Sequence, residues 1–89
     1  MPNVKTKTLM IGSPRFSGLK LMELVNAMYQ SGFIGGGSKM KMTDLILKGM
    51  DSGDFTELYG IVAEQCPRAS PSNPFWDQMR TTLSEEVQE

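Results

Sequence analysis

Residues 42–66, MTDLILKGMDSGDFTELYGIVAEQC, decide the fold, because apolar spacing, turn residues and helix-ending residues all agree in this stretch. Its first half places apolar residues at the i, i+3, i+4 and i+8 spacing of a core-facing helix, namely Met42, Leu45, Ile46 and Met50. Its second half repeats such helical spacing in Phe55, Leu58, Tyr59, Val62 and Cys66. The pattern predicts a helix-turn-helix pair over residues 40–66.

Turn and capping residues mark where these two helices end and begin. Gly53 follows Asp51 and Ser52, and glycine adopts the positive φ that ends a helix at little cost. Asp54 stands three residues before Glu57, which predicts a capping box with Asp in place of Ser or Thr. The second helix is expected to end at Pro67, because proline disfavours a helical conformation in the residue before it.

Two short helices cannot bury their apolar faces on each other alone, so flanking segments must complete the core. Residues 13–32 form the clearest of these, opening with Ser13 as N-cap and Pro14 at the first helical position. Its apolar stripe comprises Leu21, Leu24, Val25, Met28 and Tyr29. Gly32 is expected to end the helix, with the apolar pair after it folding back on the last turn.

A glycine-rich stretch, residues 33–39, separates this helix from the central pair and is interpreted as a flexible hinge. Gly32 and Gly37 imitate the spacing of a phosphate-binding loop, but Ser38-Lys39 reverses the order of lysine and hydroxyl that such a loop needs. A helix, and no strand, is expected before it. Nucleotide binding is therefore not predicted.

The C-terminal part of the chain divides into a linker and a last helix. Residues 67–73 are rich in proline and serine and are expected to be extended and exposed. Residues 74–88 open with Asn73-Pro74 and carry a helical stripe that comprises Trp76, Met79, Leu83 and Val87. Phe75 and Trp76 either anchor this helix on the core or form an exposed contact for a partner.

Residues 1–12 are predicted to form a basic arm that is extended or strand-like. Val4, Thr6 and Thr8 alternate with Lys5 and Lys7, but no second strand is expected in the chain, so a strand here needs another molecule as its partner. The fold class is accordingly all-α, a small irregular four-helix domain with a short N-terminal arm. The 89 residues suffice for one such domain.

Composition removes most catalytic chemistry. The chain has no histidine and one cysteine, which excludes an intramolecular disulfide, a histidine general base and a Cys/His zinc cluster. Cys66 is interpreted as a small buried hydrophobic residue, and the eight methionines mainly as core filling. We expect no enzyme activity, no metal and no cofactor. No signal-peptide or membrane-spanning stretch is recognised, so a cytoplasmic location is expected.

Charge is divided between the two halves of the chain. Residues 1–48 have a net charge of +5 and residues 49–89 a net charge of −6, a separation that suits steering towards a charged partner or head-to-tail self-association. The alternative is that the two halves neutralise each other across the folded domain. The leading hypothesis is a protein-binding module: a regulator, inhibitor, adaptor or assembly component, of the kind that viruses and mobile elements encode. Its predicted contacts are Phe75, Trp76, Met79, Asp51, Asp54, Glu57 and Glu64.

Two alternatives remain open at this point. A nucleic-acid-binding protein would use the basic N-terminal half, with contacts predicted at Lys5, Lys7, Arg15, Lys39, Lys41 and Lys48. Against it stands the sequence pI near 5.4. The other alternative is a homo-oligomeric structural protein in which the N-terminal segment pairs between copies.

Overall fold

The structure, a computed structural model, describes residues 11–85 and contains four α-helices and no strand within that range. The predicted all-α, four-helix fold is therefore confirmed. The basic arm predicted over residues 1–12 lies outside the described residues except for its last two. The helices are α1 Pro14–Gln30, α2 Gly36–Ser52, α3 Thr56–Gln65 and α4 Phe75–Glu85, with a short 3-10 helix, η1 Cys66–Arg68, after α3.

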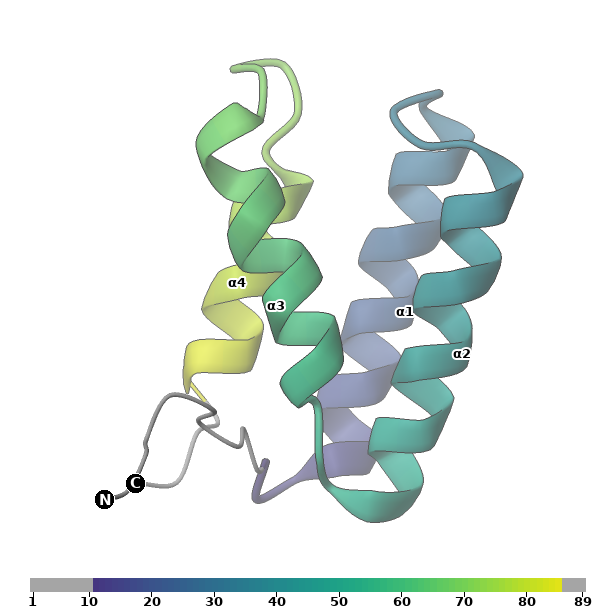
Figure 1. The fold of residues 1–89 in the computed structure, drawn as a ribbon, viewed down its shortest axis with the longest axis vertical. Coiled ribbons are helices and arrows are strands. Elements are labelled where there is room, and N and C mark those ends of the chain that lie inside the picture. The colour runs from purple at the N-terminus through teal and green to yellow at the C-terminus, as the bar shows by residue number, and fades with distance from the viewer. Residues whose placement is uncertain (1–10, 86–89) are drawn as a thin grey trace.

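The helices form two hairpins packed against each other (Figure 1). Helices α1 and α2 run antiparallel and share the most extensive contact, while α3 packs on α4 and α4 packs on α1. Helices α2 and α3, the pair predicted from residues 40–66, touch much less extensively. Helices α2 and α3 therefore belong to different hairpins and are joined by the turn between them. Helix α2 buries its apolar stripe mainly against α1, and α3 mainly against α4.

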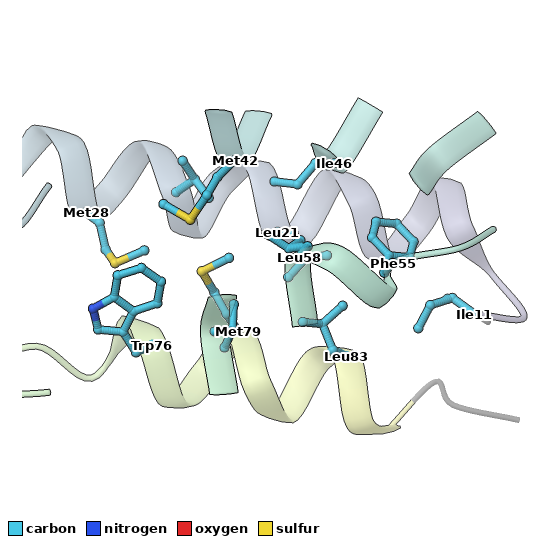
Figure 2. Close-up of a cluster of buried hydrophobic side chains, with 12 residues drawn as sticks. Ile11, Leu21, Met28, Met42, Ile46, Phe55, Leu58, Trp76, Met79 and Leu83 are labelled. Atoms are coloured by element: carbon cyan, nitrogen blue, oxygen red, sulfur yellow. The ribbon is translucent and has the colours of Figure 1, made fainter. Parts of the chain in front are cut away.

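One core is shared by all four helices (Figure 2). Its fully or nearly fully buried hydrophobic members are Ile11, Leu21, Val25, Met28, Met42, Ile46, Phe55, Leu58, Val62, Trp76, Met79 and Leu83. Most of them belong to the predicted stripes. Ile11 joins them from the predicted arm, and its backbone N–H donates to the carbonyl of Gly53 at 2.8 Å. The end of the arm is therefore anchored to the turn between α2 and α3.

Helix α1 begins and ends where its residues predict. Ser13 is its N-cap residue and Pro14 occupies the first helical position. At the other end, Gly32 has φ +79° and donates to the carbonyl of Tyr29 at 3.1 Å. Phe33 N–H bonds back to the carbonyl of Met28 at 2.9 Å, which completes the double closure typical of a helix ending on glycine. The predicted helix end at Gly32 is confirmed, and the Phe33 ring contacts Phe75.

Helix α2 starts earlier than predicted. Gly35 is its N-cap and Gly36–Lys39 form its first turn, closed by the bond from Lys39 N–H to the Gly35 carbonyl at 3.0 Å. The predicted hinge over residues 33–39 is thus only half as long, and glycine does not prevent the helix. The physical reason is tertiary: α2 spans 17 residues and so does α1, and packing along that shared length outweighs the cost of glycine, about 1 kcal/mol for each residue.

The start of α3 lies one residue later than the capping box requires. Phe55 is the N-cap residue, and Asp54 accepts from the backbone N–H of Thr56 at 2.9 Å. Asp54 N–H donates to Ser52 Oγ at 3.1 Å, not to Glu57. The predicted Asp54–Glu57 capping box is wrong in this detail, because Phe55 must turn inward to be buried, with 1% exposure, before the helix begins.

Residues 67–73 are mostly exposed, as predicted, but they are not extended throughout. Cys66–Arg68 continue as η1, and Asn73 is buried, accepting from Phe75 N–H at 3.1 Å through its Oδ1 atom. Helix α4 therefore starts at Phe75, and Asn73 caps it from two residues earlier. Asp54 caps Thr56 at the start of α3 with the same spacing. Cys66 is half-buried, and its Sγ donates to the Trp76 carbonyl at 3.4 Å.

Candidate functional site

Two surface hollows lie between α2 and α3, the pair of helices that packs least tightly. The upper hollow lies at the N-terminal end of α2, and the lower hollow lies at its C-terminal end. The upper hollow has a volume of about 440 Å³ and is lined by Phe33, Ile34, Gly35, Ser38, Lys41, Met42, Ile61, Gln65 and Trp76. The lower hollow has a volume of about 470 Å³ and is lined by Leu45, Lys48, Ser52, Asp54, Phe55, Thr56, Glu57 and Leu58. We call the two together the α2–α3 groove.

The two hollows follow one another along the same helices. On α2, the lining residues recur at helical spacing from Ser38 to Ser52, which at 1.5 Å per residue is a length of about 21 Å. On α3, they run from Thr56 to Gln65. One face of each helix therefore borders the groove, and the groove follows most of the length of α2.

The lower hollow exposes mainly apolar surface, whereas the upper hollow exposes more polar than apolar surface. Met42, Phe55 and Leu58 border the two hollows from the core and are almost completely buried. Leu45 and Ile61 are half-buried, and they leave part of their side chains facing the hollows. Such partly covered aliphatic side chains provide surface that a partner can remove from water.

The two rims of the groove carry opposite charges. Lys41 and Lys48 line it from α2, whereas Asp54 and Glu57 line it from the start of α3. All four side chains are exposed. Lys48 is also paired with an acidic residue one turn earlier on α2, its Nζ lying 3.3 Å from Asp44 Oδ2. Opposite charges therefore face each other across the lower hollow, whereas Lys41 is the single charged residue of the described chain that lines the upper hollow.

Asp54 is held in place by the first turn of α3. Its Oδ1 accepts hydrogen bonds from both the side-chain hydroxyl and the backbone N–H of Thr56. These bonds, the side-chain one first, stabilise the ionised carboxylate and lower the pKa of Asp54 below its ordinary value of 3.8. The acidic rim consequently keeps a negative charge at Asp54 at physiological pH.

The predicted apolar contacts belong mainly to the core. Met79 has no exposed surface and Trp76 has 7%, so both serve as anchors of α4, the first of the two alternatives for this segment. Only an edge of Trp76 reaches the upper hollow. Phe75 is half-buried and contacts Phe33, with ring centroids 6.0 Å apart and planes tilted by 54°.

The predicted acidic contacts are all exposed, and three of them gather at one corner. Asp51 lies in the last turn of α2, Asp54 in the turn and Glu57 in the first turn of α3. Glu64 lies two turns further along α3, about 10 Å away along the helix axis. Asp54 and Glu57 line the groove, while Asp51 and Glu64 do not.

The predicted basic contacts do not form a single patch among the described residues. Arg15 lies in the first turn of α1 and Lys39 in the first turn of α2, which places them at opposite ends of the antiparallel hairpin (Figure 1). Lys39 Nζ lies 4.8 Å from the centre of the Tyr29 ring. Lys5 and Lys7 lie outside the described residues.

Reasoning from sequence missed the lining residues that lie off the predicted stripes. Ile61 adjoins the stripe of α3 but does not belong to it, and Leu45 was assigned to the core. Ser38 and Gln65 border the upper hollow from the two helices. An apolar residue beside a complete core stripe is the sequence signal that points to such a surface.

The described part of the chain has neither a candidate metal-binding group nor a candidate membrane-spanning helix. No group of three His, Cys, Asp or Glu side chains there is placed to hold a metal ion. None of the described helices combines the length and the apolar character needed to cross a membrane. The α2–α3 groove has charged rims and a partly apolar lining, which are features suited to binding.

The chain is a small four-helix domain, and a groove with charged rims lies between its two hairpins. Comparison with protein-family models, curated proteins and solved structures found no match for this chain. Function is therefore inferred from the residues and their geometry alone.

Proposed function

We propose that this protein is a binding module for another protein, acting as a regulator, inhibitor, adaptor or assembly component, and that its α2–α3 groove receives a helical segment of the partner. One observation carries the proposal: the two hollows lie in line between the same two helices. An amphipathic helix laid in an apolar groove is a common mode of peptide recognition.

The dimensions and charges of the groove specify the partner segment. A length of about 21 Å accommodates about 14 helical residues. The half-buried Leu45 and Ile61 call for an apolar stripe on that helix. Acidic residues on one flank would face Lys41 and Lys48, and basic residues on the other would face Asp54 and Glu57.

The proposal involves no catalytic step by this chain, and it places the protein in the cytoplasm. Cys66, which is a free thiol, is compatible with a reducing compartment. Nucleic-acid binding through the basic half receives less support. Arg15 and Lys39 lie at opposite ends of their hairpin, and the acidic rim of the groove would repel phosphate.

A charge-swap variant tests the groove. Lys41→Glu together with Glu57→Lys cancels the net charge of each rim, because Lys48 and Asp54 remain, and it preserves the net charge of −1. The matched control, Lys20→Glu together with Glu23→Lys, makes the same exchange at exposed residues that line neither hollow. Tagged wild-type protein and both variants are used to capture partners from lysate, with and without nuclease, and bound species are identified by mass spectrometry.

We expect a protein that is recovered after nuclease by the wild type and by the control, and that is bound about tenfold more weakly by the groove variant. Equal recovery by both variants would show that the groove is not the binding site. Recovery that disappears with nuclease would replace the proposal with nucleic-acid binding.

A further inference from the structure

Large apolar side chains are exposed on one hairpin of the molecule. Within the described residues, the six that are exposed all lie between residues 16 and 47. The rings of Tyr29 and Phe33 already contact other side chains. The Lys39 amine lies over the Tyr29 ring, and the Phe75 ring contacts the Phe33 ring. The remaining four are Phe16, Leu19, Met40 and Leu47, with exposed fractions of 68%, 58%, 75% and 51%.

These four residues belong to the side of the α1–α2 hairpin that faces away from the core. Gly18 and Met50 mark where the helices meet, because a Cβ atom on Gly18 would lie 2.5 Å from Met50 Sδ. Leu19 follows Gly18, and Leu47 lies one turn before Met50, so both flank this contact. Their exposure places them opposite the buried residues of α1 and α2. We call Phe16, Leu19, Met40 and Leu47 the outer hairpin face.

We propose that the outer hairpin face binds a second copy of this chain, forming a two-fold symmetric dimer through α1 and α2. With roughly 200 Å² for the surface of a large apolar residue, the four exposed fractions amount to about 500 Å² per copy. That is at the upper end of the largest apolar patch on a typical monomer, about 300–600 Å². Two such faces bury about 1,000 Å² in all, before their rims are counted.

The surroundings of the face enlarge the apolar surface beyond the four exposed side chains. Met22 and Met50 are half-buried beside Leu19 and Leu47 and pack against the core, so they extend the apolar surface with side chains that adapt their shape. With them and the polar rims, the interface approaches the range of about 1,200–2,000 Å² seen for specific complexes. Two 17-residue helices supply a rigid surface about 25 Å long.

Charge on the two helices permits identical faces to meet. Helix α1 carries Arg15, Lys20 and Glu23, a net charge of +1, and α2 also has a net charge of +1. Asp44 and Lys48 flank Leu47 as a pair of opposite charges 3.3 Å apart. A two-fold axis therefore brings mixed charges against mixed charges, and avoids the like-charge repulsion that a uniformly charged face would produce.

The test is the mass of the purified chain in solution. Light scattering after size-exclusion chromatography, and sedimentation equilibrium at up to about 1 mM, are applied to the wild type and to Leu19→Gln/Leu47→Gln. Glutamine has a good helix propensity and both leucines are exposed, so this variant should fold. The matched control is Lys41→Gln, an exposed α2 residue outside the face. Circular dichroism melts verify that each variant is folded.

We expect the wild type and the control to have twice the chain mass of 9.9 kDa. We expect the double variant to dissociate at least about a hundredfold more readily, because each leucine is removed from both sides of a symmetric interface. A wild type that stays monomeric at the highest concentration would overturn the proposal. So would a double variant that dimerises as strongly as the wild type. The groove variant Lys41→Glu/Glu57→Lys should remain dimeric, so failure here and failure of the proposed groove are separate results.

Discussion

Gly49 offers the sharpest test of how α2 packs at the corner with α3. Gly49 is buried, and a Cβ atom built on it would come within 3.0 Å of three atoms of the Phe55 ring. Phe55 is only 1% exposed and belongs to the core, so a shift of its ring to make room for the new methyl group disturbs the packing of its neighbours. Replacing Gly49 with Ala should therefore strain the corner.

The magnitude follows from two opposing effects. Alanine in a helix interior is favoured over glycine by about 1 kcal/mol. Overpacking a well-packed core costs about 1–3 kcal/mol, and more where no neighbour can move. For Gly49→Ala we expect a net loss of up to about 2 kcal/mol in the free energy of unfolding. In a domain of this size, such a loss lowers Tm by up to about 15 °C.

The chain contains a matched control in the next helix. Gly60 lies inside α3, is exposed, and a Cβ atom there would meet nothing within 4 Å. Gly60→Ala should therefore gain up to about 1 kcal/mol and raise Tm. Both variants are measured by thermal and urea unfolding followed by circular dichroism. In a Phe55→Leu background, Gly49→Ala should cost less, because the ring that opposes the new methyl group is gone.

The outcome that would refute this reasoning is a Gly49→Ala protein at least as stable as Gly60→Ala. It would mean that Phe55 does not press on α2 at this point. A cost of Gly49→Ala that is unchanged by Phe55→Leu would lead to the same conclusion. Either result would remove the physical reason for a glycine at this position of α2.

Three further changes have defined expectations, each measured by urea unfolding. Gly53→Ala should lose about 1–2 kcal/mol, because φ is +85° at this residue and alanine is strained there; equal stability would contradict the turn geometry. Asp54→Ala should lose about 1 kcal/mol by removing the cap on Thr56. The pKa of Asp54 is lowered on folding, so the stability of the ionised cap is present above pH 3.8 and is lost as the pH falls below that value. The difference between wild type and Asp54→Ala should therefore shrink in acid, and a constant difference would show that ionisation is irrelevant. Leu83→Ala should lose about 2–5 kcal/mol, because Leu83 has no exposed surface; a loss below 1 kcal/mol would mean that the end of α4 contributes little to the core.

Helix ends show which parts of the fold are local in origin. Gly32 and Gly53 have the positive φ expected at helix ends, because the absence of a Cβ atom is a property of the residue itself. The start of α3 could not be placed as reliably. Asp54 does cap this helix, but Phe55 must enter the core first, so the first helical residue is Thr56. Burial of one ring by the rest of the molecule decided that shift.

The candidate site could be predicted from the sequence even less than the helix boundaries. Lys41, Lys48, Asp54 and Glu57 were recognisable from sequence as surface charges, but they were assigned to different hypotheses. The structure places them on opposite rims of one groove. No local pattern encodes that relation, because the rims belong to helices whose separation depends on how α1 and α4 pack against them. The sequence allows Trp76 to be either a core anchor or an exposed contact for a partner. Packing of the helices places it in the core.

By itself, the sequence determined the number of helices, most of their boundaries and the residues that face inward, because helical periodicity and the steric freedom of glycine act over a few residues. Only the tertiary structure decided that α1 pairs with α2 and α3 with α4. It also decided that Leu19 and Leu47 stay exposed while Trp76 is covered. The exposure of an apolar side chain depends on which helix lies beside it, and that choice minimises the apolar surface left in water over the whole chain.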